Sequence, residues 1–337
     1  MHGEVPGLSE VDRAIRKALY PAPGRLGEII GRILENRGKM LRPRLLLTCT
    51  ALAGCGKNLR SNLLFDAAAA VELIHTASLI HDDIIDEAAR RRNQETLHLR
   101  WGPGRAALVG DLLLARAFAL LSRPGGSRKL LHLLARTVAH LCRGEIYQME
   151  QRYRWELTEK QYYRINYYKT ACFIASCCEA GGLLAGASAA FCRALRNYGL
   201  KLGQAFQIVD DILDYAGYPE RLGKPVGNDL EQGRTTLPLI HLFETQKQYL
   251  KLVRMLPANT APPRELQKML REAVKKNGSL DYALAAARRK QAEAVAALQH
   301  LPEREERQAL AQIAEELTRH FAGTLGGQPV DPEIKLS

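Results

Sequence analysis

The sequence has few aromatic residues and no cysteine pair with the spacing of a metal or redox site. Phenylalanine, tyrosine and tryptophan make up 6% of the 337 residues, and the seven cysteines form no C-x-x-C pair. An odd number of cysteines without such spacing is typical of a reducing compartment, so we expect a cytoplasmic protein. Because aromatics are scarce and the basic residues are scattered, we expect no nucleic acid partner.

A secretory leader and a convincing membrane span are also missing. The first ten residues contain neither a basic nor an apolar region. Residues 171–192 carry only Glu179 as a charge, but they are rich in Gly and Ala, which favours a buried helix. The formal net charge of +12 suits anionic substrates and, at most, peripheral contact with an acidic membrane.

Alternating β-branched patterns are absent, and helical periodicity takes their place. Apolar residues recur every three or four positions over residues 25–37, 43–53, 63–85, 106–121, 129–151, 159–185, 190–216, 235–256, 263–275, 279–300 and 304–321. The Gly- and Pro-containing breaks between these segments are too short to act as domain linkers. We therefore predict a single all-α domain over residues 1–337, with frayed ends at 1–9 and 323–337.

Two acidic clusters with one spacing are the strongest signal in the chain. The pattern D-D-x-x-D occurs at residues 82–86 and again at 210–214, each time after a strongly apolar helical run. On a helix the first and third Asp lie one turn apart, so the carboxylates crowd one face and repel each other. One cluster alone could be a solvated acidic face. Mg²⁺ is usually held by one or two carboxylates together with substrate phosphates, so the pair predicts a metal-bridged diphosphate.

Basic residues alternate with the acidic clusters along the chain. They are Lys39, Arg42, Arg90, Arg91, Arg92, Lys169, Lys224 and Arg234. Arg offers a fork of donors and Lys a point charge to phosphate oxygens. Any one of these basic groups could be an ordinary surface, but their alternation with acidic clusters beside apolar helices favours a diphosphate site.

The ordered set of motifs resembles that of the trans-isoprenyl diphosphate synthases, and within that family it is most like the long-chain heptaprenyl and octaprenyl type. The resemblance is carried by Gly38-Lys39-x-Leu41-Arg42-Pro43, Glu72–Asp83, Arg91-Arg92, Gly110-Asp111, Lys169-Thr170, Phe206–Asp211, Gly223-Lys224-Pro225, Asp229-Leu230 and Gly233–Pro238. It covers residues 35–245, and the C-terminal part carries no motif of its own. It implies a large helical bundle of the isoprenoid synthase type around a central cavity, and a homodimer.

The resemblance implies a magnesium-dependent prenyltransferase. Isopentenyl diphosphate would condense with an allylic diphosphate, such as dimethylallyl, geranyl or farnesyl diphosphate. About three Mg²⁺ ions would bridge the allylic diphosphate to Asp82, Asp86 and Asp210. A further set of carboxylates would hold metal-bound waters: Asp83, Asp211, Asp214 and Asp229.

The resemblance also assigns two separate diphosphate pockets. The residues that match the allylic pocket are Arg91, Lys169, Thr170, Gln207, Lys224 and Arg234, where Arg234 replaces the usual Lys. Those that match the metal-free isopentenyl pocket are Lys39, Arg42, His75 and Arg92. His75 alone could be an ordinary buried histidine, but it lies two helical turns before Asp82 on the same face, which favours a ligand. The catalytic set is Asp82, Asp86, Asp210, Arg91, Lys169 and Lys224.

Product length is the specificity question that the sequence addresses. Ala77 and Ser78 stand five and four residues before Asp82, one turn deeper on the same face, and Ile74 follows on the next turn. The alternative explanation is that the small side chains at these positions only allow close helix packing. Short-chain members of the family carry a bulky residue there, so we expect a product beyond C20, of heptaprenyl or octaprenyl length, for quinone side chains.

Several alternatives remain open. One is a short-chain synthase that makes farnesyl or geranylgeranyl diphosphate, and another is a prenyltransferase-like subunit of a heteromeric synthase. A non-catalytic subunit should have lost an Asp or Arg from one motif, and none is missing here. A class I terpene cyclase normally carries an Asn/Asp-Ser/Thr-Glu second site, and the second D-D-x-x-D argues against it. It is also open whether the enzyme requires a small helper subunit, as some heptaprenyl enzymes do.

Overall fold

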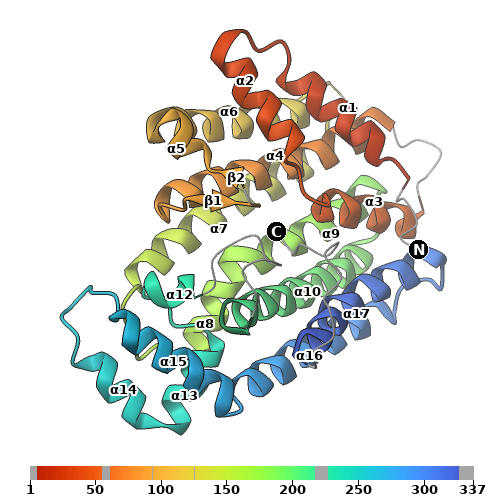
Figure 1. The fold of residues 1–337 in the computed structure, drawn as a ribbon. Coiled ribbons are helices and arrows are strands. Elements are labelled where there is room, and N and C mark those ends of the chain that lie inside the picture. The colour runs from red at the N-terminus through yellow and green to blue at the C-terminus, as the bar shows by residue number, and fades with distance from the viewer. Residues whose placement is uncertain (1–5, 55–60, 93, 125, 217–226, 326–337) are drawn as a thin grey trace.

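The computed structural model describes residues 6–54, 61–92, 94–124, 126–216 and 227–325, which are almost entirely helical (Figure 1). The elements are α1 (Leu8–Leu19), α2 (Gly24–Glu35), α3 (Leu41–Ala53), α4 (Ser61–Ile85), β1 (Arg90–Arg91), β2 (Gln94–Glu95), α5 (Leu97–Trp101), α6 (Pro103–Leu121), α7 (Arg128–Glu150), α8 (Glu159–Asn166), the π-helical turn η1 (Tyr167–Ala171), α9 (Cys172–Leu184), α10 (Ala189–Ala216), α12 (Asn228–Glu231), α13 (Leu237–Thr245), α14 (Lys247–Arg254), α15 (Arg264–Lys276), α16 (Ser279–Leu298) and α17 (Glu305–Leu325). The predicted all-α class is confirmed.

The ends of the chain differ from the prediction. Helix α1 begins at Leu8 and α17 continues to Leu325, so residues 8–9 and 323–325 are helical rather than frayed. Helix α1 forms because Val11 and Ile15 repeat at helical spacing and are buried against α4. Burying each such side chain contributes roughly 1.5–3 kcal/mol, enough to hold a short helix that would be marginal alone.

Two hydrophobic clusters form the interior, and α3 and α9 contribute to both. One cluster gathers side chains of α10, α13, α16 and α17, while the other gathers those of α1, α2, α4 and α6. On α9, Ile174 and Cys178 belong to the first cluster, and Phe173 and Cys177 belong to the second. Figure 1 shows α9 between α3 and α10, with α1, α2 and α6 on one side and α13 to α17 on the other. The prediction of a single domain stays a prediction.

Helix α4 is the apolar centre of the second cluster. Within the described residues, it is the one helix whose length and composition would allow a membrane span, over residues 62–85, and 61% of its most apolar stretch is buried inside the protein. A mostly buried helix of this kind is typical of a protein core. Residues 171–192 are not one helix, since α9 ends at Leu184 and α10 begins at Ala189.

The segment predicted as a continuous helix over residues 159–185 contains a widened turn. Helix α8 passes into the π-turn η1 before α9 begins. Helix α7 approaches this turn closely at Gly144, where an added Cβ would lie 2.4 Å from the Cβ of Tyr168. A single π-turn of this kind is frequent at functional sites, and here it contains Lys169 and Thr170.

Candidate active site

The first acidic cluster stands at the end of α4, where the helix meets arginines from two distant segments. The backbone N–H of Asp86 still donates to the Asp82 carbonyl across 2.8 Å, so Asp86 prolongs the last turn of α4. The Oδ1 atom of Asp86 accepts hydrogen bonds from Arg152 at 2.7 Å and from Arg234 at 2.6 Å. Two guanidinium groups therefore share one carboxylate oxygen.

Arg234 joins the first acidic cluster to the second. Its Nη1 atom lies 3.6 Å from Asp229, whose own backbone N–H donates to Asp214 across 3.0 Å. Burial lowers the pKa of Arg234, but Asp86 and Asp229 outweigh that effect and hold the pKa above its ordinary value. The two D-D-x-x-D clusters, far apart in sequence, are thus connected through one buried guanidinium.

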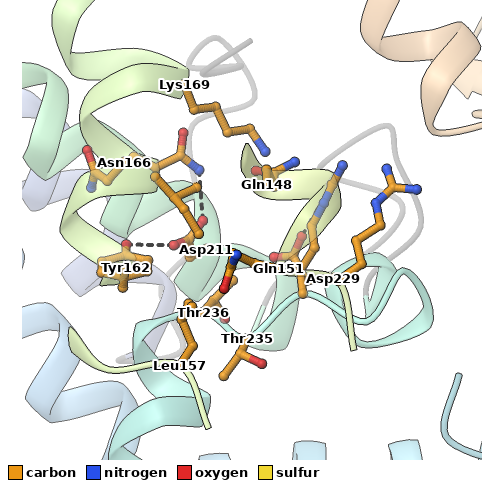
Figure 2. Close-up of a pocket in the computed structure, with 14 residues that line it drawn as sticks. Gln148, Gln151, Leu157, Tyr162, Asn166, Lys169, Asp211, Asp229, Thr235 and Thr236 are labelled. Carbon is orange, nitrogen blue, oxygen red and sulfur yellow. Dashed lines mark hydrogen bonds and ion pairs between the residues drawn. The ribbon is translucent and has the colours of Figure 1, made fainter. Parts of the chain in front are cut away.

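A pocket lies beside this connection, and we call it the first pocket (Figure 2). Its lining residues are Gln148, Gln151, Arg152, Leu157, Tyr162, Ile165, Asn166, Lys169, Gln207, Asp211, Asp229, Arg234, Thr235 and Thr236. Figure 2 shows Lys169 extending from η1 toward Gln148. The predicted allylic-pocket residues Lys169, Gln207 and Arg234 are therefore brought together, and Lys224 lies outside the described residues.

A chain of buried hydrogen bonds crosses the first pocket. Thr170 Oγ1 donates to Gln207 Oε1 at 2.5 Å, and Gln207 Nε2 donates to Asp211 Oδ1 at 2.8 Å. The hydroxyl of Tyr162 donates to the other oxygen of Asp211 at 2.6 Å. Burial and the neighbouring carboxylate of Asp229 raise the pKa of Asp211, and these two donors offset part of that cost. Asp211 therefore has both oxygens occupied by protein donors.

Asp82 has no such support. Burial and, after it, the carboxylate of Glu145 on α7 raise its pKa to about 7, although the positive charges of Lys169 and Arg91 oppose the shift. A carboxyl group in this position is costly to ionise unless another cation is present. Its surroundings are therefore those of a cation-binding carboxylate.

Across the described part of the chain, no group of three or more His, Cys, Asp or Glu side chains forms a ready-made metal site. Mg²⁺ does not need one, because it usually keeps several waters and binds one or two carboxylates plus phosphate oxygens. The crowding around Asp82, which favours an added cation, fits that mode. The carboxylates that would hold the metal are Asp82, Asp86 and Asp210, and Asp210 stands partly buried on α10.

A second pocket lies along α4. Its lining residues are Arg32, Ile33, Asn36, Arg37, Glu72, His75, Thr76, Leu79, Ile80, Asp83, Arg91, Arg92, Gln94, Glu95, Thr96 and Leu97. The short ribbon of β1 and β2 presents Arg91 to this pocket, and Arg91 Nε donates to Asp83 Oδ1 at 2.8 Å. Arg91, predicted for the allylic pocket, thus lines the second pocket and not the first, although its charge also lowers the pKa of Asp82.

His75 and Arg92, predicted for the isopentenyl site, do line the second pocket. Burial, together with the positive charges of Arg42 and Arg92, lowers the pKa of His75 well below its ordinary value. Arg42 lies next to this pocket, with its guanidinium 5.1 Å from the centre of the Phe173 ring and with its buried Nε unpaired. Lys39 is exposed and lines neither pocket.

Two of the three predicted chain-length residues lie in the hydrophobic core, and the third, Ser78, is partly buried. Ala77 is fully buried, Ile74 is 1% exposed, and both belong to the second hydrophobic cluster. Ser78 Oγ donates to the carbonyl of His75 at 2.8 Å. Neither described pocket includes these three residues, so their role in product length stays a prediction.

Several residues of the site were not predicted from the sequence. They are Arg37, Glu72, Glu145, Gln148, Arg152 and Tyr162. The sequence contained a signal for Glu145 and Gln148, because these polar residues lie one turn apart on a helix, next to Gly144. None existed for Arg152, which follows α7 in a loop among other basic residues.

Comparison with known proteins gives one family. The model of the polyprenyl synthetase family matches residues 23–273. Heptaprenyl diphosphate synthase component 2 from Geobacillus stearothermophilus is 35% identical over 309 residues, which cover 91% of this chain and 93% of that protein. Octaprenyl diphosphate synthase from Haemophilus influenzae is 35% identical over 311 residues, which cover 92% of each chain.

Relatives with shorter products match as well. A short chain isoprenyl diphosphate synthase from Methanothermobacter thermautotrophicus is 35% identical and covers 90% of this chain and 93% of its own. Among solved structures, a polyprenyl synthase from Caulobacter crescentus complexed with calcium and isoprenyl diphosphate superposes with a TM-score of 0.86. It is 34% identical, and the match covers 92% of this chain and 94% of that one.

Proposed function

This chain belongs to the polyprenyl synthetase family and is a trans-prenyl diphosphate synthase, and we propose that it joins isopentenyl diphosphate to an allylic diphosphate with the help of Mg²⁺. The observation that carries the proposal is the position of the first acidic cluster between two basic pockets. Lys169 and Arg234 line one pocket, and Arg91 and Arg92 line the other. Two diphosphates can then bind on either side of Asp82 without competing for the same cations.

The first pocket is the proposed allylic site. Mg²⁺, when bound, supplies Lewis-acid stabilisation of the departing diphosphate, which is worth several kcal/mol. Lys169 and Arg234 add fixed positive charge beside it, where charge develops in the transition state. Thr170 gives its hydroxyl hydrogen to Gln207, so its lone pairs remain available to stabilise an allylic cation.

The second pocket is the proposed isopentenyl site. Its cations suit a diphosphate without metal: Arg32, Arg37, Arg91 and Arg92. Because the pKa of His75 is lowered by burial and by Arg42, His75 is neutral at pH 7 and can donate one hydrogen bond without adding charge. Arg42 has a buried unpaired Nε, which a diphosphate oxygen could satisfy.

A product beyond C20 is the proposed outcome, for use in a quinone side chain. The small side chains of Ala77 and Ser78 support it, as do relatives named for heptaprenyl and octaprenyl products. A farnesyl or geranylgeranyl product is the second candidate, because a short-chain relative is also 35% identical to this chain. The two candidates differ only in product length, which chromatography measures directly.

We further propose a cytoplasmic homodimer, with a small helper subunit as the alternative arrangement. Apolar side chains are exposed on α5, α6 and α7: Leu99 (53%), Leu108 (69%), Ile146 (57%) and Met149 (47%). Large apolar side chains left exposed on a protein surface are the kind of residue that a subunit interface covers. The Geobacillus relative is named as one component of a synthase, which supports the alternative. Light scattering of the purified chain distinguishes a monomer from a dimer.

The reaction itself is tested with purified protein, radiolabelled isopentenyl diphosphate and farnesyl diphosphate. We expect label in diphosphates longer than C20, and we expect this incorporation to disappear when EDTA removes the metal. A chain that incorporates no label with any of the allylic primers, alone or with a helper subunit, would contradict the proposed function.

A further inference from the structure

Arg152 holds an unusual position in the first pocket. It follows α7 in the loop before α8, and its guanidinium donates to the same oxygen of Asp86 that accepts from Arg234, at 2.7 and 2.6 Å respectively. Its side chain is 21% exposed, and its Nε is buried without a hydrogen-bond partner. Arg152 therefore keeps an unused donor inside the site.

The backbone ties the Arg152 segment to the Arg234 segment. The N–H of Tyr153 donates to the Gly233 carbonyl at 2.7 Å, and Thr235 Oγ1 donates to the Arg154 carbonyl at 3.3 Å. The ring of Tyr153 covers Gly233 so closely that an added Cβ would lie 2.3 Å from it. Arg152 and Arg234 are consequently held as a pair over one carboxylate.

We propose that Arg152 is a ligand of the allylic diphosphate, and that Asp86 holds its guanidinium until a metal ion takes the carboxylate. This inference rests on the proposed function, since it names a further residue of the same site. Together with Lys169 and Arg234, Arg152 makes up the cations among the described residues that line the first pocket. When Asp86 binds metal, both guanidinium groups lose an acceptor, and diphosphate oxygens replace it.

A purely structural role for Arg152 predicts a different result. If Arg152 only oriented Asp86, its removal would weaken the binding of Mg²⁺ itself. If Arg152 instead binds the diphosphate once Mg²⁺ has taken Asp86, removing Arg152 frees Asp86 from a cation that competes with Mg²⁺. Mg²⁺ alone should then bind at least as tightly as before, while the diphosphate binds more weakly.

The experiment titrates Mg²⁺ alone, and then inorganic diphosphate at saturating Mg²⁺, by calorimetry into the wild type and Arg152→Gln. The matched control is Arg154→Gln, because Arg154 is exposed, lies two residues further along the same loop and touches neither acidic cluster. We expect Arg152→Gln to weaken diphosphate binding about tenfold, the loss of one charge-assisted contact, without weakening Mg²⁺. Arg154→Gln should match the wild type in both titrations.

Steady-state kinetics supply the second readout. Arg152→Gln should raise the KM for farnesyl diphosphate and leave the KM for isopentenyl diphosphate unchanged, and Arg152→Lys should restore part of the loss because it keeps the charge. If thermal melting shows that Arg152→Gln does not fold, Arg152→Lys carries the test with an intermediate loss. Wild-type diphosphate affinity in the folded variant, or a parallel loss of Mg²⁺ and diphosphate, overturns this inference. A wild-type chain that neither condenses the substrates nor binds diphosphate overturns the proposed function instead.

Discussion

Tyr162 and Asp211 form a buried hydrogen bond of 2.6 Å that links α8 to the second acidic cluster. Asp211 receives its other hydrogen bond from Gln207, which in turn accepts one from Thr170. Tyr162 therefore stands at one end of a series of hydrogen-bonded side chains, and Thr170 in the π-turn η1 stands at the other end. Asp210, a proposed metal ligand, is the residue next to Asp211 on α10.

Replacing Tyr162 with Phe removes one donor and leaves a buried oxygen of Asp211 without a partner. The free energy of unfolding should fall by about 1–3 kcal/mol, the usual cost of an unsatisfied buried group. Urea denaturation without metal measures this loss. Tyr163→Phe is the control, since that neighbouring tyrosine is only partly buried and its ring faces Lys290. Equal losses in the two variants would mean that the Tyr162 hydroxyl contributes nothing specific.

The acidic clusters and the helical class could be predicted from sequence because both are local patterns. The D-D-x-x-D spacing places carboxylates on one helical face wherever the helix lies, and the 3.6-residue period is visible without any partner. Helix α1 also carried this signal in Val11 and Ile15. Even so, α1 lay outside the helical segments that we predicted, the first of which began at residue 25.

Arg152 and Tyr162 could not be predicted in this way. Each acquires its role from a partner far along the chain, Asp86 for one and Asp211 for the other. The local sequence around a basic loop residue, or around a tyrosine on an amphipathic helix, does not indicate which distant residue will be its partner. The π-turn η1 was not visible in the sequence either, and it lies where α7 approaches closely at Gly144.

Substituting the proposed metal ligands tests the first acidic cluster. Asp82→Ala and Asp86→Ala should each lower kcat by about two to four orders of magnitude, since the carboxylates act mainly through stabilisation of the leaving group. Steady-state assays at saturating Mg²⁺ give the comparison, and circular dichroism checks that the helices remain. Asp281→Ala, an exposed change on α16, is the control. Variants within tenfold of the wild type would remove Asp82 and Asp86 from the metal site.

The raised pKa of Asp82 predicts a pH dependence of stability in the absence of metal. Burial and Glu145 raise this pKa from the ordinary 3.8 to about 7, so the folded state keeps a proton that the unfolded state has lost. This contribution is full below about pH 4 and falls away as the pH rises toward 7. Asp82→Asn does not titrate, so its stability relative to the wild type should rise by at most roughly 1.4 kcal/mol per pH unit over that range.

Urea denaturation at pH 5, 6 and 7 in EDTA measures this difference. Added Mg²⁺ should reduce it, because a bound cation compensates the ionised carboxylate of the wild type. A difference between the two proteins that stays constant from pH 5 to 7 would show that Asp82 ionises normally in the folded state.

The two pockets predict opposite kinetic effects. Lys169→Gln should raise the KM for the allylic diphosphate by about ten- to a hundredfold, since a charge-assisted contact is lost, and leave the KM for isopentenyl diphosphate nearly unchanged. Arg92→Gln, in the second pocket, should show the reverse. Initial-rate kinetics with each substrate varied in turn provide both constants. Equal effects of both variants on both substrates would contradict the division into two pockets.

The product tunnel provides the most demanding test, because Ala77 lies in the core rather than in a described pocket. A helix rises about 1.5 Å per residue, so Ala77 stands roughly 7–8 Å from Asp82 along α4, a depth that suits a tail of about three isoprene units. Ala77→Phe should therefore stop elongation near C15 to C20 while leaving the first condensations intact.

Overpacking is the competing explanation, since an added ring in a filled core typically costs about 1–3 kcal/mol. Ala68→Phe controls for it, because Ala68 is also fully buried on α4 but stands nine residues earlier, about two and a half turns away and thus on the opposite face. Thermal melting compares the two variants, and chromatography compares their products. A shortened product from Ala77→Phe alone places the growing tail along that face of α4, whereas long products from a folded Ala77→Phe enzyme place the tail elsewhere.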